Sequence, residues 1–411
     1  PYPYLPFVSN YTGGILSKAQ FGECIGAAAQ TCSEENLAPL GTGPYMIEEF
    51  KVNDVATYVR NPYWREEPAY FDRVVFKGGG DAASAARAVL ETGEVDYAWN
   101  LQVEPQILAE MEAAGNGEIL VSLSTNVERI LVNQANPDPA LGDMRAEWDD
   151  GNNPHPFLTF KPIPQAMSMA IVRNLIAEQL YGKGGVATCN VIVNPPNYVS
   201  AANDDCLVQD IEGAKALLDE NGVVDTDGDG IREYEGVPLK VLYQTSTNSV
   251  RQKTQALIKQ WWAELGIDTE LKNVDAGVFF GSDPASPDTY LKFFADLEMY
   301  TTSARVDPQD HLAQWQCEFI AGKENGWAGG NNHRGCSEEY DELFAELTTI
   351  PVGPERDEIV KQLNDIMIQE YFHIPLVHRG SVSAKINGLE GVRMNGGWES
   401  EMWNIEEWYR E

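Results

Sequence analysis

The segment from Leu239 to Lys272 places the strongest constraint on the fold of this chain. Apolar side chains alternate over 239–243, the period of a half-buried strand, and the alternation stops at the polar sequence TSTNS. From 251 to 265 the apolar residues recur with helical spacing, and Gly266 is a typical helix stop. Alternation returns over 267–271. The segment therefore predicts a strand, a helix and a second strand.

A helix of this length between two strands joins parallel neighbours of one sheet. The sequence thus predicts an α/β fold. In such folds, ligands bind beyond the carboxyl ends of the strands. The TSTNS sequence and the loop after Lys272 are therefore predicted to face a ligand cleft.

At 411 residues, the chain is long enough for two domains or one two-lobed unit. Periodicity predicts further strands over 45–50, 56–60, 71–76, 95–99 and 293–300. It predicts further helices over 82–91, 165–181, 211–220, 340–347 and 356–368. The intervening segment 133–164 is rich in Pro, Gly, Asp and Asn, which favours a path over the surface.

The chain is strongly acidic, with 29 basic and 63 acidic residues and a net charge of −34. This charge argues against nucleic acid and anionic membranes as partners, and it favours a cationic, zwitterionic or neutral ligand. The alternative is that the acidity serves solubility alone. No apolar run approaches the length of about 20 residues that spans a bilayer.

The six cysteines form three pairs that are close in the sequence. They are Cys24 with Cys32, Cys189 with Cys206, and Cys317 with Cys336. Six cysteines allow about fifteen pairings, and local pairing is the simplest of them. An even count without a CxxC motif favours disulfides formed in an oxidising compartment, and six reduced buried thiols are the alternative.

An acidic stretch copies the first half of a calcium-binding loop. Carboxylates at alternating positions, followed by a glycine and a backbone carbonyl, are the ligand pattern that a hard cation prefers. The last EF-hand position holds Gly236, so Glu233 or Glu235 must supply the closing carboxylate. The predicted ligands of a structural Ca²⁺ are Asp225, Asp227, Asp229, Ile231 and Glu233. The alternative is a solvated acidic turn.

Several motifs occur together in a specific order. They are GTGPY to NPYW (41–64), LETGEVDYAW (90–99), QAMSMAIVRNLIAEQLYGKGG from 165, DTDGDGIRE (225–233), NNHRGCSEEYDELF and HIPLVHR. In this order they resemble the family 5 extracellular solute-binding proteins of ABC importers, the oligopeptide- and dipeptide-binding group. The resemblance extends over nearly the whole chain from Gly41.

The resemblance implies a two-lobed periplasmic-binding-protein type II fold, in which two α/β lobes are joined by crossing strands. Lobe I would comprise residues 1–127 with 381–411 returning to it, and lobe II would comprise 128–380. Family members have a longer region before the GTGPY turn. We therefore expect either a chain that lacks the N-terminal part of lobe I or a lobe that is completed differently.

The resemblance also implies a function without catalysis: capture of a peptide or another small solute, oligosaccharides included, and delivery to the transmembrane subunits of an ABC permease by lobe closure. A monomer is expected in the periplasm or outside the cell, free or lipid-anchored. A sensory role with the same fold is one alternative. The other is a secreted hydrolase that uses a metal or two carboxylates, although GxSxG, HExxH and P-loop motifs are all missing.

The ligand contacts are predicted partly from the resemblance. In peptide-binding relatives an aspartate shortly before an acidic-Pro pair binds the peptide ammonium group. Here Asp307-Pro308 matches the pair, but Ala304 occupies the aspartate position and Arg305 follows it. An arginine suits a carboxylate or sugar hydroxyls. The predicted contacts are Tyr300, Arg305, Asp307, Trp315, Trp327, Asn331 and Asn332, with burial in the core as the alternative for each aromatic residue.

Overall fold

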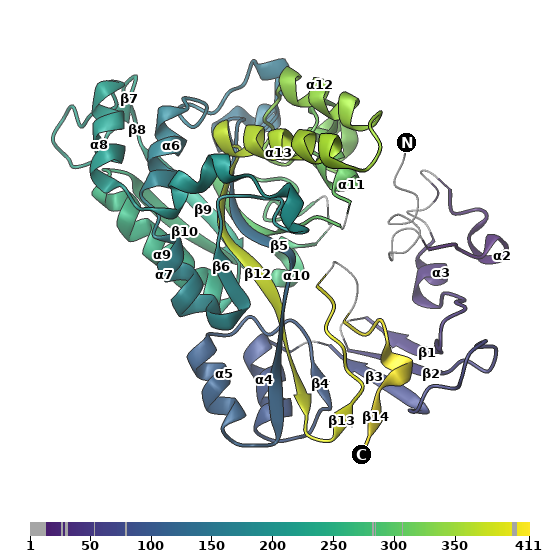
Figure 1. Cartoon of the computed structure of the whole chain (residues 1–411). Helices are drawn as coiled ribbons and strands as arrows, with labels where there is room; N and C mark the ends of the chain where they lie inside the picture. The colour runs from purple at the N-terminus through teal and green to yellow at the C-terminus, as the bar shows by residue number, and fades with distance from the viewer. Residues whose placement is uncertain are drawn as a thin grey trace. The chain divides into compact units, whose positions relative to one another are not determined.

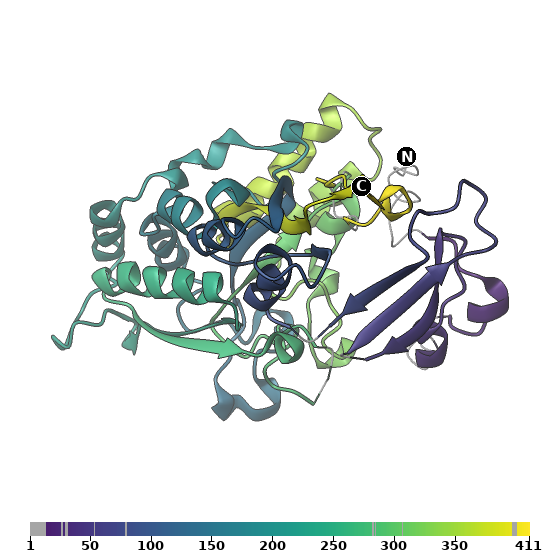
Figure 2. The ribbon, with the colours of Figure 1, turned by 90° about the horizontal axis from the view of Figure 1, so that it is seen from below.

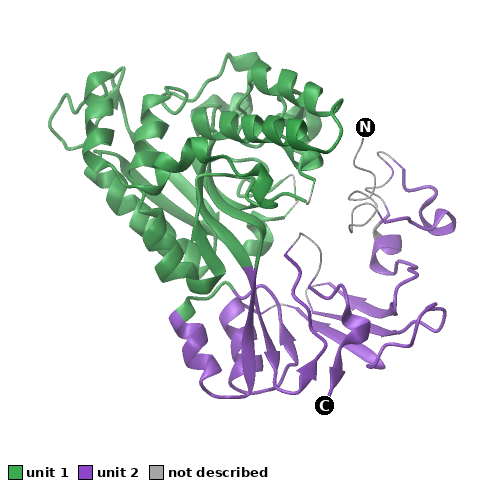
Figure 3. Ribbon diagram, in the orientation of Figure 1, with its two compact units in different colours: residues 1–3, 102–105, 123–380 green, residues 4–101, 106–122, 381–411 purple. Residues whose placement is uncertain are grey.

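The computed structural model describes residues 14–411 except 26–27, 29–31, 53, 79, 282, 284, 306 and 397–400. Its contacts divide these residues into two compact units (Figure 3). Unit 1 contains 102–105 and 123–380, and unit 2 contains 14–101, 106–122 and 381–411. The division at 380/381 coincides with a predicted lobe boundary. The other division lies at 122/123, where 127/128 is predicted, and the assignment of 102–105 to unit 1 is not foreseen by the sequence.

Unit 2 contains a three-stranded antiparallel meander, visible as the purple arrows in Figure 2. Its strands are β1 (Tyr45–Lys51), β2 (Val55–Arg60) and β3 (Arg73–Lys77). The unit also contains α2 (Lys18–Phe21), α3 (Ser33–Leu37), α4 (Ala82–Leu90), β4 (Tyr97–Ala98), most of α5 (Pro105–Glu112), β13 (Leu389–Glu390) and β14 (Tyr409–Arg410). The predicted strands 45–50 and 56–60 and the predicted helix 82–91 correspond to β1, β2 and α4.

Unit 1 is built on a mixed sheet in the order β10-β9-β11-β5-β12, with β6 also paired to β12 (Figure 1). The strands are β5 (Gly117–Val132), β6 (Gly185–Ala187), β9 (Lys240–Ser246), β10 (Asp268–Val274), β11 (Leu297–Ser303) and β12 (His373–Ile386). β9 runs parallel to β10 and β11, whereas β11 is antiparallel to β5. Strands β5 and β12 carry the chain between the two units.

The helices of unit 1 include the predicted one between β9 and β10. They are α6 (Pro162–Met169), α7 (Arg173–Ile176), α8 (Ile211–Glu220), α9 (Ser249–Glu264), α10 (Ala276–Phe279), α11 (Gln309–Ala313), α12 (Glu338–Leu347) and α13 (Pro354–Gln369). A small hairpin, β7 (Glu233–Tyr234) with β8 (Val237–Pro238), follows α8. The β9-α9-β10 unit is therefore parallel, as the sequence predicts.

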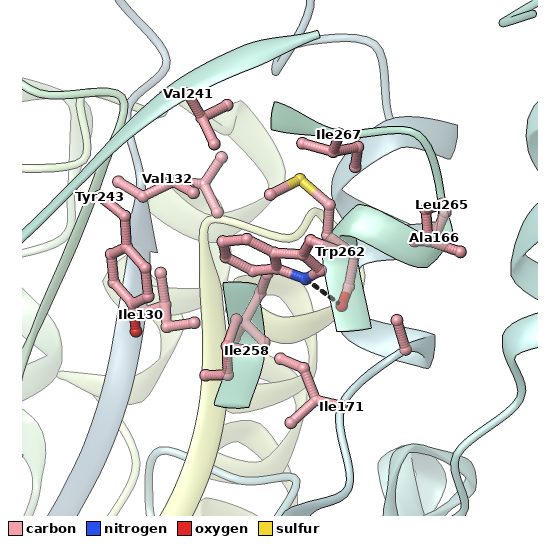
Figure 4. Close-up of a cluster of buried hydrophobic side chains, with 14 of the residues drawn as sticks. Ile130, Val132, Ala166, Ile171, Val241, Tyr243, Ile258, Trp262, Leu265 and Ile267 are labelled. Atoms are coloured by element: carbon pink, nitrogen blue, oxygen red, sulfur yellow. Dashed lines mark hydrogen bonds between the residues drawn. The ribbon is translucent and has the colours of Figure 1, made fainter. Parts of the chain in front are cut away.

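The apolar stripe of α9 packs on this sheet around Trp262 (Figure 4). The Trp262 indole is fully buried, and its Nε1 donates a hydrogen bond to the carbonyl oxygen of Met167 at 2.9 Å. Ile258 and Leu265 share the buried face, while Trp261 is only partly buried. Gly266 has a φ of 74°, and a Cβ there would lie 3.0 Å from Cγ of Arg232. A glycine therefore ends the helix for both conformational and steric reasons.

A second core holds α12 and α13, which lie side by side in Figure 1. Tyr340, Phe344 and Leu347 of α12 pack with Leu363 and other apolar residues of α13. Trp315 and Phe372 belong to the same core. This core and the one around Trp262 give unit 1 two apolar layers.

Three predictions about the elements of unit 1 are wrong. The predicted helix 165–181 breaks between α6 and α7, where the buried guanidinium of Arg173 binds backbone oxygens of Ser168 and Pro375. The predicted strand 293–300 begins only at Leu297, because Phe293 has a left-handed φ of 44°. The segment 133–164 is not confined to the surface, since Phe157 is buried.

The structure contains the three predicted disulfides, Cys24–Cys32, Cys189–Cys206 and Cys317–Cys336. Each closes a loop of fewer than 20 residues, with sequence separations of 8, 17 and 19. Within the described part of the chain, no helix combines the length and the apolar composition that crossing a lipid bilayer requires.

Candidate functional site

The carboxyl ends of β9, β10 and β11 meet at one edge of the unit 1 sheet. The antiparallel strand β5 reaches the same edge, where Glu128 pairs with Thr301 and Asn126 pairs with Ser303. β12 is adjacent, since the Ser124 hydroxyl donates to the backbone oxygen of Arg379 at 2.9 Å. We call the side chains gathered here the rim: Asn126, Glu128, Ser246, Arg251, Phe280, Thr301, Ser303 and Arg379. Sheets of this kind bind ligands at such an edge.

A buried ion pair between α9 and β5 organises the rim. Arg251 donates through Nε and Nη2 to the two oxygens of Glu128 at 2.8 and 3.2 Å. Thr301 Oγ1 also donates to Glu128, at 2.8 Å, and it accepts from Nη1 of Arg379 at 3.0 Å. Ser246 Oγ accepts from Nη1 of Arg251 at 2.8 Å. The network thus joins residues of β5, β9, β11, β12 and α9.

Two arginines set the charge state of Glu128. Burial alone would raise the pKa of Glu128, but the guanidinium groups of Arg251 and Arg379 lower it below its ordinary value. The carboxylate is therefore ionised and lies beside two guanidinium groups, in a chain whose net charge is −34.

Aromatic side chains flank the ion pair. Phe280 follows α10 and is 47% exposed, and the Arg251 guanidinium lies 5.7 Å from its ring centre. Tyr290 and Tyr300 lie behind it, with ring centres 5.8 and 6.5 Å from that of Phe280. An aromatic wall beside a few oriented polar groups is the usual lining of a small-molecule site.

Two of the predicted ligand contacts lie next to the rim. Tyr300 precedes Thr301 in β11, and its ring is buried beneath Phe280. Arg305 follows the end of β11 and pairs with Asp310 at 2.8 Å, with 24% of its side chain exposed. Asn332 is 5% exposed and donates through Nδ2 to the Tyr300 hydroxyl at 3.2 Å. This buried hydrogen bond positions the Tyr300 hydroxyl from the interior of unit 1.

The structure corrects four of the predicted contacts, because their polar or aromatic groups are used within the protein. Asp307 is buried in an ion pair with Arg356 at 3.0 Å. Asn331 is fully buried and donates to the backbone oxygens of Trp315, Gln316 and Gly335. Trp315 belongs to the core of α12 and α13, and Trp327 is 7% exposed against Phe294.

Sequence reasoning missed Glu128, Arg251, Phe280 and Arg379. Glu128 lies among apolar residues in the strand sequence NVERILV, which also contains Arg129, and a charged residue inside such a strand is a signal for a buried partner. Arg251 follows Asn248, whose side chain accepts from the Arg251 backbone N–H at 3.1 Å and caps α9. The capping pattern was visible in TSTNS, but the partner on β5 was not.

The predicted acidic loop connects α8 to β7 and contains none of the rim residues. Asp225, Asp227, Asp229 and Glu233 each place one carboxylate oxygen within 4.8 Å of the others. Asp225 accepts hydrogen bonds from the backbone N–H groups of Gly228 and Gly230, which lower its pKa. Several ionised oxygens that converge in this way suit a hard cation such as Ca²⁺.

Comparison with known proteins agrees with the α/β fold and the predicted family. Residues 1–313 match the model for "Bacterial extracellular solute-binding proteins, family 5 Middle". The nickel-binding periplasmic protein of Escherichia coli K12 is 26% identical, over 57% of this chain and 41% of that protein. The oligopeptide-binding protein AppA of Bacillus subtilis is 22% identical, over 90% of this chain and 62% of AppA.

The fold itself is shared with a solved structure. AppA of Bacillus subtilis, in complex with a nonapeptide, superimposes with a TM-score of 0.74 at 20% identity, covering 97% of this chain and 72% of that one. This likeness confirms the predicted two-lobed fold class. The chain spans only 41% and 62% of the lengths of the two relatives above.

Proposed function

This chain belongs to the family 5 bacterial extracellular solute-binding proteins, and we propose that it captures a peptide or another small solute and delivers it to an ABC permease. The proteins that it resembles are binding proteins, which agrees with a function without catalysis. The matches give the hydrolase alternative no support. The observation that carries the proposal is the family match together with the rim in unit 1.

The chemistry of the rim supports a small solute with a polar or anionic end. A guanidinium group can bind a carboxylate in a bidentate manner, and the rim contains the guanidinium groups of Arg251 and Arg379. The half-exposed ring of Phe280 offers a face for an apolar or aromatic side chain or a sugar ring. A short peptide combines both features, and an acidic oligosaccharide is the second candidate.

The rest of the proposal concerns location and partners. The relatives named above include a periplasmic protein, and the family is extracellular by description. We propose the same side of the membrane for this chain, either periplasmic or extracellular, with or without a lipid anchor. Its partners would be the transmembrane subunits of the permease, and closure of the two units around the solute would be the signal.

Isothermal titration calorimetry tests the proposed function. The folded protein, freed of retained ligand by unfolding and refolding with its disulfides intact, is titrated with di- to nonapeptides and with oligosaccharides. We expect micromolar or tighter binding of one class, and recovery of the solute unchanged after incubation. Absence of binding by a folded protein, or cleavage of the solute, would contradict the proposal.

Replacement of Phe280 by alanine is expected to weaken solute binding about fivefold, since loss of an aromatic stacking partner costs about 1 kcal/mol. Because Phe280 is half-exposed, the melting temperature should hardly change. Phe319→Ala is the matched control, since Phe319 is 41% exposed and ends the short 3-10 helix Cys317–Phe319, outside the rim. Equal affinity of the two variants would exclude Phe280 from the site.

We also propose that the acidic loop binds a structural Ca²⁺ through Asp225, Asp227, Asp229, Glu233 and the carbonyl oxygen of Ile231. A chelator should then lower the melting temperature by roughly 5 °C without changing which solute binds. Asp227→Asn should abolish this response to the chelator, whereas Asp283→Asn, on a different loop, should leave it intact. An unchanged melting temperature in the chelator would make this segment an ordinary acidic turn.

A further inference from the structure

Arg129 is a buried cation that makes no ion pair with any residue that the structure describes. It lies in β5, is 3% exposed, and donates through Nη1 to the backbone oxygen of Tyr300 at 2.9 Å. Its guanidinium lies 4.6 Å from the centre of the Tyr300 ring. Among the described residues, no carboxylate is within ion-pair distance of it, and its Nε has no acceptor. The neighbouring Glu128 is engaged by Arg251 instead.

Two buried histidines near Arg129 also carry unsatisfied donors. Nδ1 of His333 accepts from the backbone N–H of Gly335 at 2.9 Å, so the proton of the neutral ring is on Nε2, which has no partner. Within the described part of the chain, neither ring nitrogen of His373 has a hydrogen-bond partner, and one of them carries a proton in the neutral ring. Both residues are fully buried, and their ring centres are 4.9 Å apart.

Asn332 extends the same cluster. Its Nδ2 donates to the Tyr300 hydroxyl, while its Oδ1 is buried without a donor. If the amide is turned by 180°, the Tyr300 hydroxyl can donate to Oδ1, and Nδ2 then becomes a further free donor. Burial and the positive charge of Arg129 together lower the pKa of His333 and of His373. Both rings are therefore neutral.

A buried arginine without a carboxylate is not unusual in itself. Arg173 is also fully buried, but it donates to the backbone oxygens of Pro375, Ser168 and Cys206 and to the Ser168 hydroxyl. Arg129 has one such acceptor, the backbone oxygen of Tyr300, and its Nε has none among the described residues. A buried charge and several buried N–H groups without acceptors each cost free energy, which a bound acceptor would recover.

We propose that Arg129, His333, His373 and Asn332 form an internal binding site for a small monovalent anion, either a halide or a carboxylate the size of formate. Such an anion accepts hydrogen bonds from several N–H groups at once and neutralises the guanidinium. All four residues are buried, so we propose an anion of this size and no larger one. The site does not depend on the proposed function, because its residues lie inside unit 1 and apart from the rim network.

Thermal unfolding at constant ionic strength tests the site. Sodium chloride and sodium formate are each compared with sodium gluconate, whose anion is too large to enter. We expect at least one small anion to raise the melting temperature of the wild type by roughly 4 °C over gluconate. Arg129→Met should lose this difference, and Arg173→Met, which removes a buried arginine with satisfied donors, should keep it.

Crystals soaked in sodium bromide provide a second measurement that needs no variant. An anomalous peak within hydrogen-bond distance of Nε of Arg129 is expected if halides bind. Equal melting temperatures in all three salts, or a difference that Arg129→Met retains, would overturn the proposal. Should Arg129→Met fail to fold, a wild-type crystal with neither a bromide peak nor formate density at Arg129 would overturn it.

Discussion

Replacing Glu128 by leucine is expected to lower the free energy of unfolding by about 3–5 kcal/mol, since removal of one partner strands a buried charge. Both oxygens of this fully buried carboxylate bind Arg251, and Arg379 also lies close. In the variant, the buried guanidinium of Arg251 would lose its counter-charge, and that of Arg379 would lose a neighbouring carboxylate. Urea unfolding at pH 7.5 measures the loss.

An exposed ion pair gives the matched control for Glu128. Asp310→Asn removes the partner of Arg305 at a partly exposed position, and such pairs contribute about 0–1 kcal/mol. The double variant Glu128→Leu, Arg251→Met should recover much of the lost stability, because it removes one of the stranded cations. A cost for Glu128→Leu no larger than that of Asp310→Asn would contradict the role assigned to this pair.

The Glu128 network also fixes the positions of the rim side chains. It joins residues of β9, β11, β5 and β12 through one carboxylate, two guanidinium groups and two hydroxyls. Its stability therefore fixes the geometry of the groups that would meet a solute. Glu128→Gln retains hydrogen-bonding capacity but removes the charge. It should lower the free energy of unfolding less than Glu128→Leu does, and it should still weaken solute binding.

Local patterns were sufficient to predict the core of unit 1. The alternation before TSTNS, the helical stripe around Trp262 and the stop at Gly266 are each encoded within a few residues. They correspond to β9, α9 and β10, whose parallel pairing follows from the length of the connection. The three local cysteine pairs were predictable for the same reason, since their partners are close in the sequence.

Long-range pairing was not predictable from these patterns. β5 and β12 form the centre of the sheet and are fixed by partners more than 100 residues away, such as Arg251 for Glu128. The four predicted ligand residues that the structure buries could not be recognised for the same reason. Asp307 looked available in the sequence, but Arg356 of α13 neutralises it, and the backbone oxygens that occupy Asn331 leave no trace in the residue pattern.

Lowering the pH from 7.5 to 5 is expected to destabilise unit 1 by about 2 kcal/mol for each of its three clustered histidines. Burial, assisted by Arg129, lowers the pKa of His311 and His333 to about 3 and that of His373 well below its ordinary value. The unfolded chain binds protons below an ordinary histidine pKa of about 6.5, whereas the folded chain does not. Stability is therefore full above that pH and is lost as the pH falls toward 3.

Glu298 opposes this trend, because burial raises its pKa and favours the folded state as the pH falls. The histidine contribution is therefore isolated with variants, in urea unfolding between pH 7.5 and 5. His373→Phe should flatten the dependence of unfolding free energy on pH by about 2 kcal/mol over this interval. Trp315→Phe, which alters the packing against His311 and His373 but keeps all three histidines, should lower stability without changing the slope. If His373→Phe kept the wild-type dependence of unfolding free energy on pH, the ring of His373 would be protonated in the folded protein. That result would contradict the assignment of neutral histidines beside Arg129.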